Sequence, residues 1–332
     1  MSAGPGPRQA PDAALWDAFF RGDRVACARL ISLVEDRPDL LPEIRDHLLP
    51  RRRGAVRIGI TGPPGVGKST ITAALARRAV SAGHSVGVIA VDPSSPFTGG
   101  AFLGDRVRMQ GLLGDERVFI RSMASREGHG GLSPATPYAA EVFDAFGMDR
   151  ILIETVGVGQ AELDVLSSAD LIALVLQPGT GDVIQALKAG IIEAADVLLV
   201  NKSDLPGTES LLDALRFLYE IGGRPQDSPP PPVFTTSAVK DQGLDEAYAG
   251  IETLIAGHAR SGRLRDRQRR RLEQELRETL REGLWERFAA LTGADDALRD
   301  AAGDLLERNG SPYPFLRAMA ARVRMEIEDE RT

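Results

Sequence analysis

The eight residues GPPGVGKS at positions 62–69 constrain the fold of this chain more than any other stretch. An apolar run, Val56–Thr61, precedes them, and a helical pattern over Ser69–Ser81 follows them. The three glycines let the backbone curl until several N–H groups point at one phosphate group. A strand, a glycine-rich loop and a helix in this order are typical of the phosphate-binding P-loop.

Two side chains of this motif have distinct expected roles. Lys68 reaches the β- and γ-phosphates and is expected to be catalytic, because it neutralises charge that develops there. The Ser69 hydroxyl is expected to bind Mg²⁺. The residues expected to bind the nucleotide here are Gly62, Pro63, Pro64, Gly65, Val66, Gly67, Lys68, Ser69 and Thr70.

Around the motif, short apolar runs alternate with amphipathic stretches. Strands are expected at Val56–Thr61, Val86–Val91, Val118–Ser122, Ile151–Glu154, Leu171–Leu176, Val197–Val200 and Val233–Thr236. Helices are expected at Ser69–Ser81, Pro137–Phe146, Val183–Glu193 and Thr208–Ile221. Continuous apolar strands are covered on both faces, so the alternation predicts an α/β fold, a P-loop domain with a mostly parallel sheet.

Three segments follow from these patterns. Residues 1–53 form a helical prefix, residues 54–257 the P-loop domain, and residues 258–332 a helical C-terminal extension with a final helix over Tyr313–Ile327. Within the extension, large apolar residues step by four along one expected helix face: Leu272, Leu276, Leu280, Leu284 and Phe288. Such a stripe needs burial, and we expect a homodimer through it.

The same extension has a competing interpretation. Seven arginines lie between Arg260 and Arg271, which could suit an anionic partner such as RNA. No aromatic residues alternate with these arginines to stack on bases, and the chain carries 40 basic against 47 acidic residues, a net charge of -7. The charge balance therefore argues against a nucleic-acid partner.

Composition excludes further classes. No apolar run is long enough to span a membrane, so no membrane association is expected. The first residues lack the layout of a secretory signal, and a cytoplasmic location is the expectation. Cys27 is the only cysteine, and with four histidines a Cys/His metal site is not expected. Among the 40 basic residues the lysines are Lys68, Lys188, Lys202 and Lys240.

A second motif, NKSD, begins at Asn201 directly after the expected strand Val197–Val200. The carboxylate of Asp204 can accept two hydrogen bonds from guanine, and adenine offers no such pair of donors. Asn201 would brace the site, and the stem of Lys202 would lie against the base. Without the P-loop upstream, the motif could equally be an ordinary polar turn.

A third short element, SAV, follows the last expected strand. A backbone N–H of Ser237, Ala238 or Val239 could donate to the guanine O6 atom. On its own this tripeptide could be a plain exit from a strand. It indicates a guanine site because it follows the P-loop and the NKSD motif in the expected chain order.

Acidic residues near strand ends are candidate Mg²⁺ ligands. Asp92 follows one expected strand and Glu154 ends another, although a helix cap or a solvated loop position would also explain them. Asp105, in a long Gly- and Pro-rich loop, is a third candidate, with a surface carboxylate as the alternative. Gly157 is placed to contact the γ-phosphate, but Val158 follows it where Ras-like enzymes have a water-orienting Gln, so slow hydrolysis is expected.

Four strings, GPPGVGKST, VDPSSPFTGGAFLGDRVRM, ETVGVGQAE and NKSD, together resemble the MeaB/ArgK family of G-protein chaperones of methylmalonyl-CoA mutase. The methylmalonic aciduria type A protein is a relative in that family. The likeness covers nearly the whole chain. The segment from Gln177 to Lys188 resembles the family's third switch loop, which implies a catalytic role for Lys188 in stimulated hydrolysis.

The resemblance implies a homodimer held by the C-terminal extension. It implies GTP or GDP as the bound nucleotide, Mg²⁺, and GTP hydrolysis coupled to adenosylcobalamin loading, protection and reactivation of the mutase. No cobalamin-ligating motif is found, so direct cobalamin binding is not expected. Two alternatives stay open: a nickel-insertion GTPase, which would need Cys/His ligands, and a nucleotide-dependent kinase of a transport-associated protein, which would need an acceptor site and a base.

Overall fold

The structure of the chain is a computed structural model that describes residues 9–92, 110–112, 114–124, 133, 135–155, 161–179, 190–221, 230–308 and 310–319. The chain divides into two compact units, Met1–Arg265 and Asp266–Thr332. The expected boundary at residue 257 lies within a helix of the first unit.

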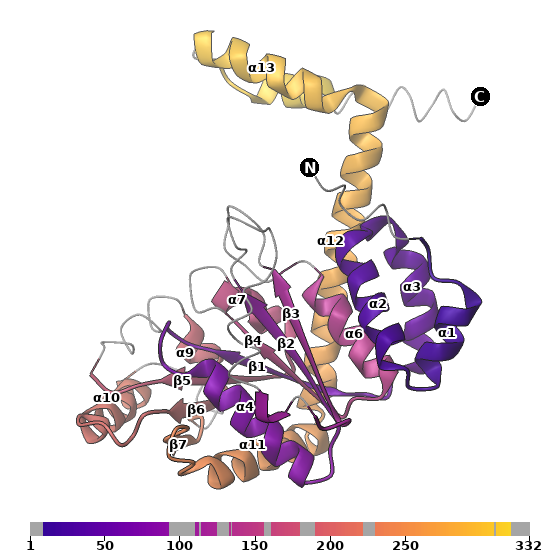
Figure 1. Cartoon of the computed structure of the whole chain (residues 1–332). Helices are drawn as coiled ribbons and strands as arrows, with labels where there is room; N and C mark the ends of the chain where they lie inside the picture. Colours follow the sequence, from indigo (N-terminus) through magenta and orange to yellow (C-terminus); the bar gives the residue numbers. More distant parts are fainter. Residues whose placement is uncertain are drawn as a thin grey trace, which may run out of the picture. The chain divides into compact units, whose positions relative to one another are not determined.

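A fully parallel sheet forms the centre of the first unit (Figure 1). Its strands in the described residues are β1 (Val56–Thr61), β2 (Val86–Asp92), β3 (Val118–Ala124), β4 (Arg150–Glu154), β5 (Leu171–Leu176), β6 (Val197–Val200) and β7 (Val233–Thr235). They lie in the order β3-β2-β4-β1-β5-β6-β7, and every pairing is parallel. The expected α/β fold with a parallel sheet is confirmed.

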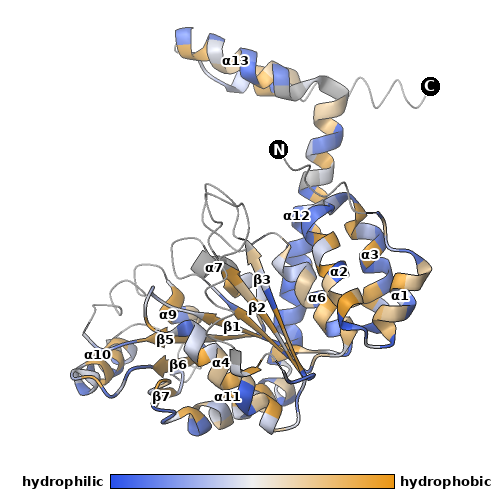
Figure 2. Ribbon diagram, in the orientation of Figure 1, coloured by the Kyte–Doolittle hydropathy of each residue, from blue (hydrophilic) through white to orange (hydrophobic). Residues whose placement is uncertain are grey.

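Helices cover both faces of this sheet. Residues of α4 (Lys68–Ser81) and α11 (Leu244–Arg260) share one core with side chains of β1, β2 and β5. The other face is covered by α6 (Thr136–Phe146), α7 (Ala161–Ser168), α9 (Ile191–Ala194) and α10 (Thr208–Ile221). Figure 2 shows the central strands as predominantly hydrophobic, as expected for strands buried on both sides.

The helical prefix packs on the second of these faces. It contains α1 (Ala13–Phe20), α2 (Arg24–Asp36) and α3 (Leu41–Leu48), with short 3-10 turns at Pro38–Leu40 and Leu49–Arg51. The ring centroids of Phe19 and Phe146, from α1 and α6, are 5.4 Å apart. The prefix therefore shares one hydrophobic core with the sheet and is part of the same compact unit.

At the junction between the prefix and β1, one carboxylate accepts three backbone hydrogen bonds. Asp144 Oδ1 accepts hydrogen bonds from the backbone N–H groups of Arg53, Gly54 and Ala55, at 2.8, 2.8 and 3.1 Å. Because α6 carries Asp144, the segment that leads into the first strand is anchored to the helix on which the prefix packs.

The described part of the second unit is mostly helical. Helix α12 (Arg263–Thr292) starts at the end of the first unit, and α13 (Ala294–Arg308) follows it. Residues 313–319 are helical, whereas the rest of the expected helix Tyr313–Ile327 lies outside the described residues. Leu276, Leu280 and Leu284 are 60–63% exposed on α12. In the part of the chain that the structure describes, no helix has both the length and the apolar character to cross a membrane.

Several expected elements have shifted bounds. Strand β2 includes Asp92 as its last residue, and β3 extends to Ala124. The expected helix over Val183–Glu193 is seen only as α9, which spans Ile191–Ala194, and residues 180–189 lie outside the described part.

Candidate nucleotide-binding site

The loop between β1 and α4 depends on glycine at two positions. Gly62 has a φ of +143°, and a Cβ atom there would lie 2.1 Å from the Val175 carbonyl oxygen. Gly67 has a φ of +95° at the start of α4, and a Cβ there would lie 2.5 Å from the Asn201 Nδ2 atom. The loop therefore curls tightly against the ends of β5 and β6, at the carboxyl edge of the sheet.

Lys68 lies inside the curl of this loop. Its side chain is buried, and Nζ donates hydrogen bonds to the carbonyl oxygens of Gly62 at 2.7 Å and Pro63 at 2.9 Å. A cation is thus held at the point where the phosphate groups of a nucleotide are expected to bind.

Ser69 and Glu154 meet beside this lysine. The Ser69 hydroxyl donates a 2.5 Å hydrogen bond to Glu154 Oε1, and both residues are buried. Glu154 is the last residue of β4, which pairs with β1, so the sheet brings the carboxylate to the start of α4. Hard oxygen donors of this kind suit Mg²⁺, which keeps several water and phosphate ligands besides one or two from the protein.

The side chains of the other candidate metal ligands, Asp92 and Asp105, are not among the described ones. Asp92 ends β2, whose pairing with β4 places its backbone at the same carboxyl edge. Asp105, Gly157 and Lys188 lie outside the described residues. Among the side chains that are described, no group of three or more His, Cys, Asp and Glu could hold a metal ion. The described Mg²⁺ candidates are therefore Ser69 and Glu154.

Asn201 joins the phosphate loop to the second half of the site. It is 2% exposed, and its Nδ2 donates to the Val66 carbonyl at 2.8 Å. Its Oδ1 accepts from the Ala238 N–H at 3.1 Å and from the Thr236 hydroxyl at 3.3 Å. One buried amide thus links the P-loop, the end of β6 and the segment after β7.

Asp204 lies where the base of a nucleotide is expected. Its Oδ1 accepts a 2.7 Å hydrogen bond from the Ser237 hydroxyl, and its Oδ2 is 3.3 Å from Lys240 Nζ. The Ser237 hydroxyl, and after it Lys240, hold the pKa of the Asp204 carboxyl below its ordinary value. The carboxylate is therefore ionised at neutral pH and can accept hydrogen bonds from two N–H donors.

The neighbouring loop residues complete this arrangement. Lys202 has a φ of +57°, and its Nζ donates to the Gly65 carbonyl at 2.7 Å, so the lysine stem extends from the NKSD segment to the P-loop. Ser237 and Ala238 are buried, whereas Val239 is 89% exposed. The structure thus brings the described residues of the three sequence motifs together at one edge of the sheet.

Two residues of this arrangement had no role in the sequence analysis. Lys240 was noted only as one of few lysines, and that scarcity was the signal that could have indicated it. Thr236 was treated as a strand residue, but it follows β7, and its hydroxyl donates to Asn201. No local pattern distinguishes such a threonine.

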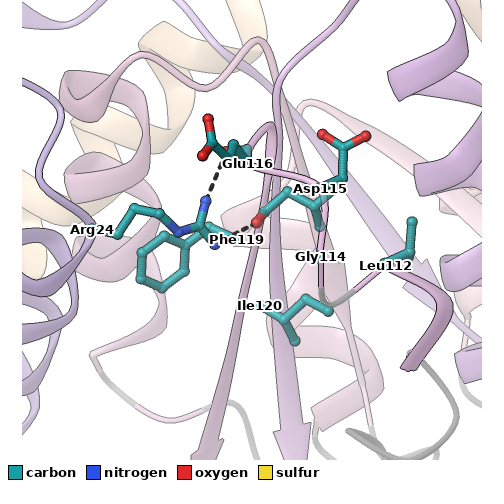
Figure 3. Close-up of a pocket in the computed structure, with 8 residues that line it drawn as sticks. Arg24, Leu112, Gly114, Asp115, Glu116, Phe119 and Ile120 are labelled. Carbon is teal, nitrogen blue, oxygen red and sulfur yellow. Dashed lines mark hydrogen bonds between the residues drawn. The ribbon is translucent and has the colours of Figure 1, made fainter.

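A pocket of about 450 Å³ opens at the start of β3, at the opposite edge of the sheet (Figure 3). The Arg24 guanidinium lies over the Phe119 ring and donates to the carbonyl oxygens of Glu116 and Val118. Asp115, also in its lining, pairs with Arg117 at 2.7 Å. Because these charged groups are already paired with the protein, this pocket is not our candidate site.

The fold and the site define the class of this protein. A parallel sheet whose first strand enters a phosphate loop, with an Asn-Lys-x-Asp segment at the end of β6, is the arrangement of a P-loop GTPase. The chain belongs to the MeaB family, whose model, described as methylmalonyl Co-A mutase-associated GTPase MeaB, matches residues 27–292.

Individual relatives agree with this assignment. The chain is 45% identical over 271 residues to a protein of Pyrococcus abyssi named a GTPase, with 79% of this chain and 82% of the relative covered. It is 37% identical over 317 residues to the GTPase ArgK of Escherichia coli, with 93% and 96% covered. Among solved structures, one titled LAO/AO transport system kinase has a TM-score of 0.71 at 27% identity, with 95% and 100% covered.

Proposed function

We propose that this chain is a cytoplasmic, Mg²⁺-dependent GTPase that acts as a G-protein chaperone of methylmalonyl-CoA mutase. In this proposal, GTP binding and hydrolysis are coupled to adenosylcobalamin loading, protection and reactivation of the mutase. The family description supports the partner, because it names a mutase-associated GTPase. The alternatives of nickel insertion and of a kinase are not better supported, and we do not propose them.

The observation that carries the nucleotide part is the Asp204 carboxylate, which accepts a 2.7 Å hydrogen bond from the Ser237 hydroxyl beside the backbone of residues 237–239. Guanine presents N1–H and an amino group to a carboxylate and its O6 atom to a backbone donor. Adenine lacks this pattern, and a site built for donors that the ligand lacks rejects it strongly. The arrangement therefore favours guanine over adenine nucleotides.

Guanine selectivity can be tested by calorimetric titration with GDP and ADP. The unmodified chain should bind GDP far more tightly than ADP, and Asp204→Ala should remove that preference. Asp213→Ala is the matched control, because Asp213 is an exposed carboxylate on α10 that pairs with Arg216. Equal GDP and ADP affinity in the unmodified chain would contradict the proposed specificity.

The phosphate side supports hydrolysis. Lys68 would stabilise negative charge on the β- and γ-phosphates, while Ser69 and Glu154 would hold Mg²⁺. The bound Mg²⁺ would supply charge neutralisation at the phosphate oxygens. Because Val158 stands where a water-orienting Gln is common, we propose that turnover is slow in the absence of the mutase.

Stimulation by the mutase is proposed to act through Lys188. Lys188→Ala should abolish the increase in GTP turnover that added mutase causes, measured as released phosphate. An equal increase in the variant and in the unmodified chain would contradict this role.

We further propose that the chain is a homodimer through α12. The exposed leucines of this helix support the proposal, since burying five large apolar side chains contributes on the order of 8–15 kcal/mol before entropy costs. Leu276→Glu combined with Leu280→Glu should give a monomer in light scattering. Val25→Glu, at a 77% exposed position of α2, is the control that should leave the dimer intact.

A further inference from the structure

The turn between β7 and α11, residues 237–242, carries the candidate contacts to the base. A reciprocal pair of backbone hydrogen bonds closes it, from Ser237 N to the Gln242 carbonyl at 3.0 Å and from Gln242 N to the Ser237 carbonyl at 3.1 Å. The Lys240 N–H adds a third bond to the Ser237 carbonyl at 3.1 Å. The position of the Ser237 hydroxyl and of the Ala238 N–H therefore depends on the conformation of this one turn.

The turn contains one residue with a Cβ atom in the left-handed region. Asp241 has a φ of +55°, a conformation that Asp adopts more readily than most residues but less readily than glycine. Gly243, two residues later, has a φ of +68° and no such penalty. Contacts to the Asp241 side chain therefore add to the backbone hydrogen bonds that set the conformation of this turn.

Arg78 forms ion pairs with two carboxylates at this turn. Its Nη2 donates to Asp241 Oδ1 at 3.1 Å, and its Nε donates to Asp245 Oδ1 at 2.7 Å, in the first turn of α11. Its Nη1 lies 3.4 Å from the Ala74 carbonyl, so all three nitrogens of the guanidinium have acceptors. The Arg78 side chain is 12% exposed, in contrast to 66% for Asp241 and 84% for Asp245.

Arg78 lies on the helix that begins at the phosphate site. Arg78 belongs to α4, the helix that begins with Lys68 and Ser69 and lies beside α11 (Figure 1). One guanidinium thus connects the helix of the phosphate site to the turn of the base site. An arginine fork can hold two carboxylates in a fixed relative geometry, which the single ammonium of a lysine cannot.

We propose that Arg78 is a positioning residue for guanine recognition, which fixes the turn 237–242 against α4 so that Ser237 keeps its hydrogen bond to the Asp204 carboxylate and Ala238 keeps its hydrogen bond to Asn201. This inference rests on the proposed guanine specificity and adds the residue that maintains it. We do not propose a direct contact between Arg78 and the nucleotide. Its effect is therefore on the base contacts, while the phosphate contacts of Lys68 and Ser69 are preserved.

Base recognition and phosphate binding should then respond differently to loss of Arg78. Arg78→Met keeps an unbranched apolar stem but removes both ion pairs. We expect GDP affinity to fall about tenfold, which corresponds to about 1.4 kcal/mol, and ADP affinity to stay the same. The KM for GTP should rise by a similar factor with kcat unchanged, because the released turn does not contact the reacting phosphate.

Arg77→Met is the matched control. Arg77 is the preceding residue of α4, its side chain is exposed, and its removal should leave the affinities for GDP and ADP as they are. Calorimetric titration of both nucleotides and steady-state GTP turnover should be measured on all three full-length proteins.

Substitutions at Asp241 test the same proposal from the other partner, at an exposed position where folding is not at risk. Asp241→Ala removes the ion pair and keeps the unfavourable φ, so GDP affinity should fall as in Arg78→Met. Asp241→Gly also removes the ion pair but relieves the backbone, so most of the GDP affinity should be retained.

Several outcomes would overturn the inference. An equal fold loss of GDP and ADP affinity in Arg78→Met would show a general structural role, and unchanged affinities for both nucleotides would show no role at all. Equal behaviour of Asp241→Ala and Asp241→Gly would exclude the turn conformation as the cause. If the unmodified chain itself does not prefer GDP over ADP, the proposed guanine specificity is wrong. If the unmodified chain prefers GDP and the Arg78 variant keeps that preference, only the proposed role of Arg78 is wrong.

Discussion

Asn201 gives a direct test of how the two halves of the nucleotide site are joined. Its side chain makes three hydrogen bonds, to the Val66 carbonyl, the Ala238 N–H and the Thr236 hydroxyl, and all four residues are buried. Asn201→Ala removes the three bonds together. It also leaves buried polar groups in the P-loop and after β7 without their partner.

The size of the effect follows from these contacts. A hydrogen bond contributes about 0.5–1.5 kcal/mol net, and a buried polar group left unsatisfied costs about 1–3 kcal/mol. We therefore expect Asn201→Ala to lower the free energy of unfolding of the first unit by about 2–4 kcal/mol. For a unit of this size the melting temperature should fall by about 5–15 °C.

Differential scanning calorimetry without and with GDP measures both consequences. The melting temperature of Asn201→Ala should be lower without nucleotide, and added GDP should raise it less than in the unmodified chain, because binding stabilises in proportion to affinity. Asp204→Ala is the control, since that carboxylate is 25% exposed and its loss should weaken GDP binding with little change in the nucleotide-free melting temperature.

One result would refute this reasoning. If the nucleotide-free Asn201→Ala protein melted within about 2 °C of the unmodified chain, the three hydrogen bonds would not contribute as the geometry implies. If only the rise in melting temperature caused by GDP were smaller in the variant, Asn201 would act by contacting the ligand and not by joining the P-loop to the segment after β7.

Three further predictions concern the site and the tail. Lys68→Ala should lower GTP turnover by about two orders of magnitude, measured as phosphate release, as expected for the loss of a main electrostatic stabiliser; an unchanged rate would contradict its catalytic role. GDP affinity should hold as the pH falls until the lowered pKa of Asp204 is reached, because only the ionised carboxylate accepts both guanine donors. Lys240→Met should move that loss of affinity to higher pH in titration calorimetry, and an unmoved profile would exclude Lys240 as a cause. In the tail, Trp285→Ala should weaken dimerisation in sedimentation experiments, since its 45% exposed ring stacks on Phe288 along the proposed interface; an unchanged dimer would place the interface elsewhere.

The central sheet could be predicted well because its signal is local. Strands β1, β5 and β6 have the predicted bounds, since each is buried along its whole length, and β5 and β6 are uninterrupted apolar runs. The P-loop could also be predicted from the sequence, because its glycines are required sterically. A Cβ atom at Gly62 or Gly67 would clash with neighbouring atoms.

The end of the P-loop domain was harder to place from the sequence. The sequence predicts a boundary at Gly257, whereas α11 continues to Arg260. A Cβ at Gly257 would meet nothing within 4 Å, so this glycine occupies an ordinary position within the helix and gives no stop signal. The chain instead turns at Gly262, which has a φ of +78°.

Contacts between distant segments were not visible in the hydrophobic pattern. Lys240 pairs with Asp204, and Arg78 pairs with Asp241 and Asp245, and hydrophobic periodicity does not report such ion pairs. The prefix was predicted as helical, but its shared core with α6 depends on side chains more than a hundred residues away. Asp105, Gly157 and Lys188 remain predictions, because they lie outside the described residues.

That shared core has a consequence for the order in which the chain is made. The ribosome releases Phe19 long before it synthesises Phe146, the ring that lies 5.4 Å from it in the finished protein. At about 5–20 residues per second, the aromatic side of α1 waits several seconds to tens of seconds for α6 to emerge. During that interval the nascent prefix presents an apolar surface with no native cover, and a molecular chaperone that binds such surfaces has its best opportunity there.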